Sequence, residues 1–241
     1  MNDFVIGAIA AFVPAFLSAV LILVLEKCVS SRVAKNERTI ARHNKEMDRL
    51  RVAKGWAYRS FTMLSEDMAI AKALSRGKFF MGGEGVNINL QLPMPIQEVN
   101  LSDIDTVSVD LKNASLALEH KVKLFNYTIE GFRGLYDRVV DLCYLSDWAL
   151  LKNVEFRDNT NRDFRIIEKE IHVRADELRR ELIQFACMID VYFGGIAKMG
   201  IRKAHWWNNF GKIIEKKNSI RINTNEVISK TNDFMSRIGF E

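Results

Sequence analysis

The chain holds four side chains of the kind that most often does chemistry in proteins, the histidines His43, His120, His172 and His205. None of them belongs to an HExxH helix, and the Glu-x-x-His pattern of a di-iron bundle does not occur. Glu168 lies four residues before His172 on the same helix face, but two ligands are too few for a metal site. The glycine cluster at 82–85 lacks the Gly-Lys-Ser/Thr of a phosphate loop. The sequence therefore predicts no metal, no cofactor and no catalytic residue.

Two arginine-to-histidine spacings resemble the R-x4–6-H motif of the HEPN ribonucleases, which are also helical bundles. They run from Arg38 to His43 and from Arg165 to His172. In that family the Arg and His of two protomers converge on the scissile phosphate. The resemblance implies an RNA-cleaving toxin or defence effector. Such an effector, or one that damages membranes, is the alternative to a non-catalytic function.

The strongest pattern lies at the start of the chain, where no charged side chain occurs between Phe4 and Leu25. At about 1.5 Å per helical residue, this run reaches roughly 33 Å and can cross a hydrocarbon core of about 30 Å. A signal peptide has a basic first segment and a shorter apolar core, and this chain has neither. We therefore expect residues 1–26 to form a retained, single-pass transmembrane anchor.

Small residues recur at every fourth position of this predicted span, a pattern that lets helices approach closely in lipid. They are Gly7, Ala11, Ala15 and Ala19. We expect this face to mediate self-association into a homo-oligomer. Pro14 removes one backbone hydrogen bond within the span and predicts a kink.

Basic side chains gather directly after the run, in a predicted juxtamembrane helix at residues 27–54. Residues 26–54 hold nine basic and four acidic residues, which leaves the remaining chain with 26 of each. An excess of Lys and Arg beside a span marks the cytoplasmic side and attracts anionic headgroups. The sequence thus predicts a prokaryotic inner-membrane protein with its N-terminus outside. The predicted lipid-binding residues of this flank are Lys27, Arg32, Lys35, Arg38 and Arg42.

A second basic segment at 198–221 combines cations with a tryptophan pair. The predicted lipid- or anion-binding residues here are Arg202, Lys203, Trp206, Trp207 and Lys212. Paired Trp with flanking cations suits a helix in the headgroup region, and it also suits single-stranded nucleic acid stacked on the indoles. A bundle helix with buried aromatics and solvated charges has the same composition. Nucleic acid is the least favoured of these partners, because the basic excess of the whole chain lies in the membrane flank.

Residues 55–241 are expected to form one mainly α-helical cytoplasmic domain, a bundle of long antiparallel helices. A weak coiled-coil seam of Val33, Ile40 and Met47 leads from the juxtamembrane helix toward a helix at 56–75. Alternating residues 86–92 predict a strand within a small β insertion at 78–111. Apolar residues with four-three spacing predict long helices at 111–143 and 164–192, with a turn at 158–161 and a break or kink at 194–195. Helices at 200–217 and 225–238 complete the prediction.

These patterns favour a non-catalytic, membrane-tethered helical interaction module. Such a module acts as a scaffold, sensor or regulatory subunit that self-associates at the cytoplasmic face of the membrane. Its expected partners are anionic lipid headgroups, further copies of itself and another protein. The three widely spaced cysteines fit a reducing compartment and do not form a disulfide framework.

Overall fold

The computed structural model describes residues 2–78, 80–81, 85–86, 91–99, 108–145, 152–198 and 220–239. Within these ranges, the side chains of residues 2–13, 15, 77–78, 80–81, 85–86 and 145 lie outside the description. The described helices are α1 (Asn2–Ala73), α2 (Val109–Leu145), α4 (Val154–Lys198) and α6 (Thr224–Arg237). The mainly α-helical bundle expected from the sequence is confirmed.

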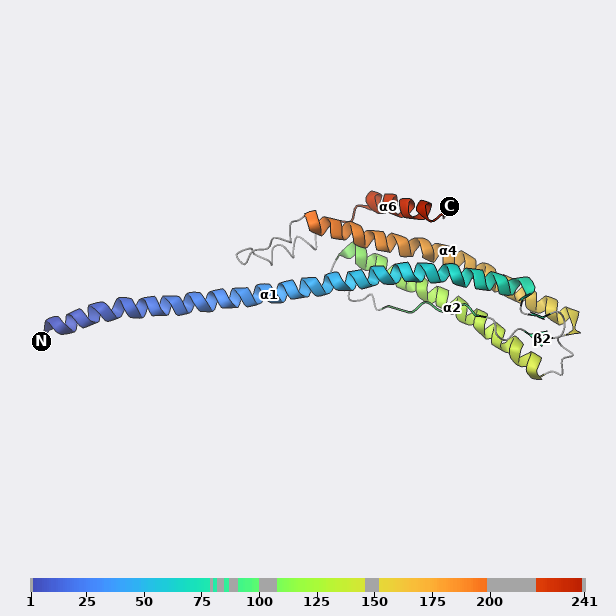
Figure 1. Ribbon diagram of the computed structural model, residues 1–241, viewed down its shortest axis with the longest axis horizontal. Coiled ribbons are helices and arrows are strands. Elements are labelled where there is room, and N and C mark those ends of the chain that lie inside the picture. Colours follow the sequence, from blue (N-terminus) through green and yellow to red (C-terminus); the bar gives the residue numbers. More distant parts are fainter. Residues whose placement is uncertain are drawn as a thin grey trace.

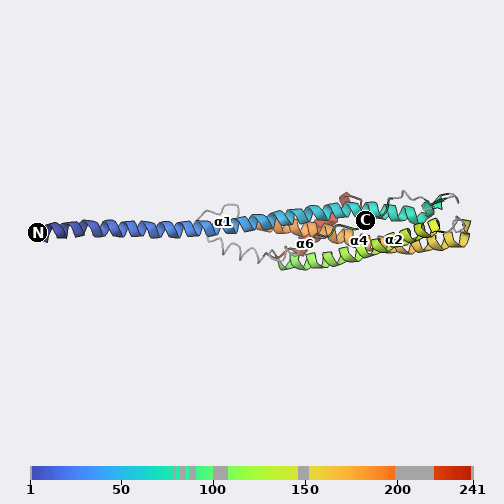
Figure 2. The same ribbon diagram turned by 90° about the horizontal axis from the view of Figure 1, so that it is seen from below.

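Helix α1 is a single rod of 72 residues, and only its second half belongs to the bundle (Figures 1 and 2). Its apolar seam begins as a half-exposed line and becomes buried at Met47 and Leu50. From there Ala57, Phe61 and Leu64 continue the four-three spacing against α4. The predicted helices at 27–54 and 56–75 are therefore one continuous element.

Helix α4 is the centre of the bundle, because it contacts α1, α2 and α6. It runs antiparallel to α1 and to α2, whereas α1 and α2 run in the same direction (Figure 1). Its core residues keep the spacing of a heptad seam, and the ring of Phe164 packs at a tilt against Phe132 of α2, with ring centroids 5.2 Å apart. The buried face of α4 includes Ile171, Ala175, Leu178, Leu182, Phe185, Ile189 and Tyr192.

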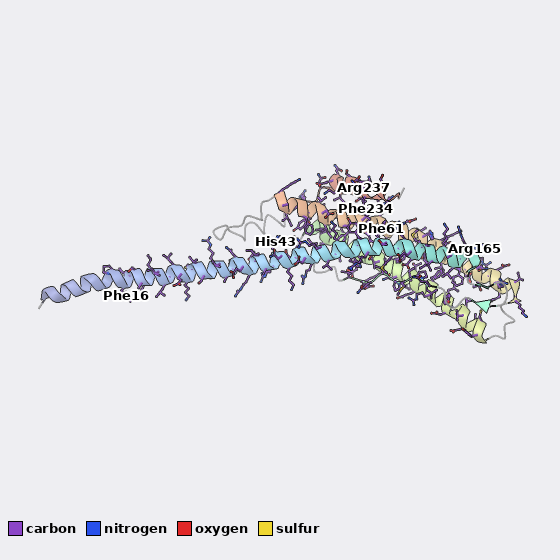
Figure 3. The ribbon with its side chains drawn as sticks, viewed as in Figure 1. Phe16, His43, Phe61, Arg165, Phe234 and Arg237 are labelled. Carbon is purple, nitrogen blue, oxygen red and sulfur yellow. The ribbon has the colours of Figure 1, made fainter. Side chains whose placement is uncertain are left out.

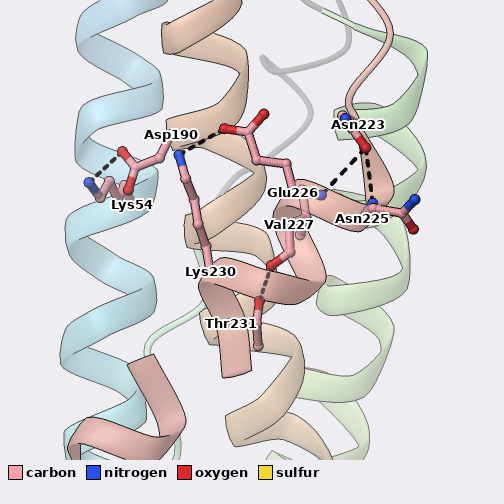
Figure 4. Close-up of polar contacts among 8 residues, drawn as sticks. All are labelled: Lys54, Asp190, Asn223, Asn225, Glu226, Val227, Lys230 and Thr231. Carbon is pink, nitrogen blue, oxygen red and sulfur yellow. Dashed lines mark hydrogen bonds and ion pairs between the residues drawn. The ribbon is translucent and has the colours of Figure 1, made fainter. Parts of the chain in front are cut away.

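The C-terminal helix α6 confirms the prediction for 225–238 and packs against α4 (Figure 4). The side-chain oxygen of Asn223 caps its first turn by accepting from the backbone N–H of Asn225 at 3.1 Å. Near its end, Phe234 lies against the rings of Tyr58 and Phe61 on α1, with centroids 5.5 and 6.1 Å away. The helix therefore holds α1 and α4 together.

The region between α1 and α2 contains little regular structure among its described residues. A π-helical turn, Leu74–Lys78, ends α1, and β1 (Phe80–Met81) pairs antiparallel with β2 (Gly85–Val86). Residues 91–99 form neither helix nor strand. Residues 87–90 of the predicted strand over 86–92 lie outside the described residues, so this strand is unconfirmed, and the β insertion at 78–111 remains a prediction beyond this two-residue pair. Its last part, 109–111, belongs to α2.

The predicted turn at 158–161 is wrong, because these residues lie within α4. Their polar side chains are compatible with helix: the Thr160 hydroxyl is buried and donates to the Phe156 carbonyl oxygen at 2.8 Å. The predicted break at 194–195 is also wrong, since α4 continues to Lys198. A Cβ on Gly195 would lie 3.1 Å from Ile220, so this glycine serves a close approach between segments.

Candidate functional site

The N-terminal part of α1 extends well beyond the bundle as a bare helix (Figures 1 and 2). From Phe16 to Leu25 it carries eight large apolar side chains that are all exposed, with Phe16 at 57%, Leu21 at 62% and Leu23 at 64%. Phe16 is labelled on this extension in Figure 3. Because most of these positions are consecutive, the apolar surface surrounds the helix instead of forming a stripe.

No described helix contains a sufficiently long and apolar stretch, over the residues with described side chains, to span a membrane. The predicted span over 4–25 is therefore unconfirmed. The side chains of residues 4–13 and 15 lie outside the description, and with them the predicted contact residues Gly7, Ala11 and Ala15. Ala19 and Pro14 are exposed, and α1 is continuous through Pro14. The Ser18 hydroxyl donates to the Pro14 carbonyl oxygen at 2.8 Å.

The predicted lipid-binding residues of the basic flank lie on the part of α1 between the apolar run and the bundle. We call this part, residues 27–46, the stalk. All five predicted side chains are exposed, and no ion pair to a described residue involves them; they are Lys27, Arg32, Lys35, Arg38 and Arg42. The stalk therefore presents an uncompensated positive charge to its surroundings.

The two arginine–histidine pairs are far apart in one protomer. Figure 3 shows His43 on the stalk side of the bundle and Arg165 near its opposite end. His172 is half-buried, and its Nδ1 lies 3.4 Å from Glu168 Oε1 on the same helix. Among the described residues, no group of three or more His, Cys, Asp or Glu side chains is placed to hold a metal ion. One protomer thus does not bring these residues into a single site.

The second predicted lipid-binding group lies outside the described residues. It comprises Arg202, Lys203, Trp206, Trp207 and Lys212, together with the helix predicted at 200–217. The described chain on either side ends at Lys198 and resumes at Ile220.

A short strap that the sequence analysis missed joins α1 to α2. It consists of residues 91–99, and Ile96 at its centre is buried. The Asn126 side chain on α2 accepts from the Ile96 N–H at 2.7 Å and donates to the Ile96 carbonyl oxygen at 2.8 Å. On α1, the Trp56 indole N–H donates to the Gln97 carbonyl oxygen at 2.9 Å. The strap therefore receives from side chains the hydrogen bonds that a sheet neighbour would otherwise supply.

Asp67 of α1 also contacts the strap, and it is unusual because its carboxyl group is buried. Only 4% of the residue is exposed, and one carboxylate oxygen accepts from the Met94 N–H at 2.9 Å. The other oxygen is buried without a hydrogen-bond partner. Burial raises the pKa of this carboxyl to about 6, although the Met94 N–H lowers it. The signal in the sequence is an acidic residue between Leu64 and Ala71, at core spacing.

A cleft of about 820 Å³ opens where α2 begins, between α4 and the segment that leads into α6. Its walls mix polar and apolar side chains, including Ser108, Gln184 and Met188. The Asp110 carboxylate accepts from the Ile222 N–H at 3.1 Å across this region. That bond ties the segment before α6 to the start of α2.

The chain was compared with family models, with curated proteins and with solved structures, and none of the three comparisons found a match.

Proposed function

We propose that this chain is a non-catalytic, membrane-tethered interaction module that self-associates at the cytoplasmic face of a prokaryotic inner membrane. The apolar run over 4–25 is its single transmembrane anchor, the stalk separates the anchor from the bundle, and the bundle meets a partner. The observation that carries the proposal is the bare apolar extension of α1.

The exposed side chains between Phe16 and Leu25 are costly in water. Burying one Val, Leu, Ile or Phe side chain contributes about 1.5–3 kcal/mol, and eight such side chains are exposed in this segment. Because they point in all directions, a single partner helix covers only part of them. A lipid bilayer covers all of them at once and also satisfies the rule that a spanning segment makes its backbone hydrogen bonds internally.

The stalk supplies the orientation of this anchor. Its excess of Lys and Arg begins directly after the run, which favours a cytoplasmic position for the stalk and bundle. In an upright helix, Lys27 stands about 3 Å and Arg32 about 10 Å beyond the end of the run. Both side chains therefore reach the headgroup layer, where each basic residue contributes about 1 kcal/mol of attraction to anionic lipid.

Self-association is assigned to the small-residue face of the anchor. Gly7, Ala11, Ala15 and Ala19 allow two helix backbones to approach closely, which in lipid favours packing over contact with lipid tails. We expect Ala15→Leu combined with Ala19→Leu to reduce crosslinked oligomers in native membranes. Val20→Leu lies off this face and serves as the control.

Membrane fractionation tests the anchor. The full chain should remain in the membrane pellet after extraction at pH 11, and a chain lacking residues 1–26 should be released. Phe12→Arg combined with Phe16→Arg, near the centre of the run, should also release the protein, since each arginine at a span centre costs about 2.5–3.5 kcal/mol. Val52→Arg, at an exposed position of the bundle, should change nothing. Release of the full chain, or retention of the double variant, would contradict the proposal.

A further inference from the structure

One face of the stalk carries a line of basic side chains whose spacing is that of a helix-packing seam. Lys35, Arg38, Arg42 and Lys45 follow one another at intervals of three, four and three residues. At about 100° per residue, they fall within an arc of roughly 80° on the helix. All four are exposed. We call this line the basic seam.

Several neighbours of the basic seam are small and uncharged. Ser31, Ala34 and Ala41 lie beside it and are all exposed, so a second backbone can approach the helix closely there. Glu46, four residues after Arg42, lies at one edge of the seam, and Glu37 falls on another side of the helix. Like charges three or four residues apart destabilise an isolated helix, so this arrangement favours an anionic partner.

The membrane itself is out of reach for most of the basic seam. The headgroup layer is about 5–7 Å thick on each side, and screening limits electrostatic attraction to about 8 Å at physiological salt. In an upright α1, Arg38 stands about 20 Å and Lys45 about 30 Å beyond the end of the apolar run. Because α1 is continuous from Asn2 to Ala73, the stalk cannot lie flat on the bilayer while residues 4–25 cross it.

Helix α2 of a second copy in the same membrane does not bring its described acidic residues to the height of the basic seam. The exposed acidic residues of α2 with similar spacing are Glu130, Asp137 and Asp141. They follow Asn126 along α2, and therefore lie farther from the membrane than Asn126 does. The strap places Asn126 near the level of Trp56 on α1. The basic seam lies on the membrane side of Trp56. Copies anchored in one membrane therefore hold their acidic and basic lines at different heights.

The spacing identifies the class of partner. Alternating intervals of three and four residues, as in a heptad, form the line along which one helix follows another, and the path of phosphates in a nucleic acid does not share them. The seam also has no aromatic side chain on which a base could stack. We infer that the basic seam docks an acidic helix of another protein, and this inference rests on the proposed membrane-tethered function, which sets the height of the stalk.

The experiment uses the full chain in nanodiscs of zwitterionic lipid and two labelled synthetic peptides. One peptide carries glutamates at alternating three- and four-residue intervals in an Ala/Gln helix, and the other has the same composition with the glutamates scattered around the helix. Fluorescence anisotropy at 50 and 150 mM NaCl should show tighter binding of the patterned peptide. Arg38→Glu, Arg42→Glu and Lys45→Glu together should weaken the binding of the patterned peptide about tenfold. Three weak ion pairs with its glutamates then become like-charge repulsions.

A matched triple variant controls for net charge. Arg51→Glu, Lys72→Glu and Arg76→Glu change three exposed basic residues near or beyond the start of the bundle, and they should leave the affinity within about twofold. Equal binding of both peptides, or equal effects of both triple variants, would overturn the inference. Tighter binding of polyuridylic acid, lost in the seam variant, would overturn it in favour of nucleic acid. Extraction of the same proteins at pH 11 shows separately whether the anchor holds.

Discussion

Asp67→Asn should stabilise the protein at neutral pH, which is unusual for a substitution at a buried, hydrogen-bonded position. The folded state raises the pKa of the Asp67 carboxyl from 3.8 to about 6. Each pKa unit corresponds to about 1.4 kcal/mol, so ionised Asp67 reduces the free energy of unfolding by about 3 kcal/mol. The asparagine removes this charge, and its side-chain oxygen still accepts from the Met94 N–H.

The pH dependence follows from the sign of the shift. Because the folded pKa is higher than the unfolded one, the favourable contribution of protonated Asp67 is complete below about pH 4 and is lost as the pH rises through about 6. The advantage of Asp67→Asn over the wild type should therefore be close to zero at pH 4. The advantage should grow as the pH rises from 4 and reach about 2–3 kcal/mol at pH 7.5.

Urea unfolding of the full chain in detergent, followed by circular dichroism at several pH values, measures this difference. Glu66→Gln, an exposed carboxyl beside Asp67, is the control and should change stability by less than about 0.5 kcal/mol. A gain that is constant between pH 4 and 7.5 would refute the electrostatic reasoning. A loss at pH 7.5 would show that the carboxylate has a compensating partner.

Three other substitutions test the packing. Asn126→Ala should cost about 2–4 kcal/mol in urea unfolding, because it leaves the buried N–H and carbonyl of Ile96 without partners, and a loss below 1 kcal/mol would contradict the role of the strap. Gly131→Ala should stabilise α2 by about 0.5–1 kcal/mol, since a Cβ there meets nothing within 4 Å. Gly195→Ala should gain less in thermal unfolding, because its Cβ would lie 3.1 Å from Ile220, and the reverse order would contradict the packing.

The long helices could be predicted because apolar side chains at four-three spacing have one stable use in a soluble domain, which is burial against a neighbouring helix. Phe164, Leu178 and Tyr192 follow this spacing, and all are buried in α4. The turn at 158–161 could not be excluded in this way, because polar residues suit both a turn and the exposed first turns of a helix. Tertiary contacts at Phe156 and Phe164 decide between the two.

The strap could not be predicted from periodicity, because its hydrogen bonds join side chains to an irregular backbone. Asn126 and Trp56 satisfy the strap from two different helices, and neither residue departs from an ordinary helical pattern. Asp67 is the exception, because a carboxylate at core spacing is rare unless it has a partner. A search for charged residues within apolar stripes would have found it.

The apolar line along α1 shows that a sequence pattern predicts which face of a helix can be buried, but not where along the helix a neighbouring helix covers that face. The same four-three line runs from Val33 through Leu64, yet Ile40 is exposed and Met47 is buried. The change occurs where α4 ends, because Lys54 pairs with Asp190 at 2.6 Å and α4 continues for only eight residues beyond it. Burial along α1 is therefore set by the length of α4, a quantity that the sequence of α1 does not contain.

The length of the stalk has a consequence for any partner. About 20 residues separate the end of the apolar run from the first buried residue, Met47, which corresponds to roughly 30 Å of helix. A tether needs only a few residues, and a flexible linker would place the bundle at many heights, whereas a rigid helix fixes one. If the run is an anchor, the stalk therefore presents the basic seam at a defined distance from the bilayer. A partner anchored in the same membrane would meet the seam only if its acidic helix stood at the same height.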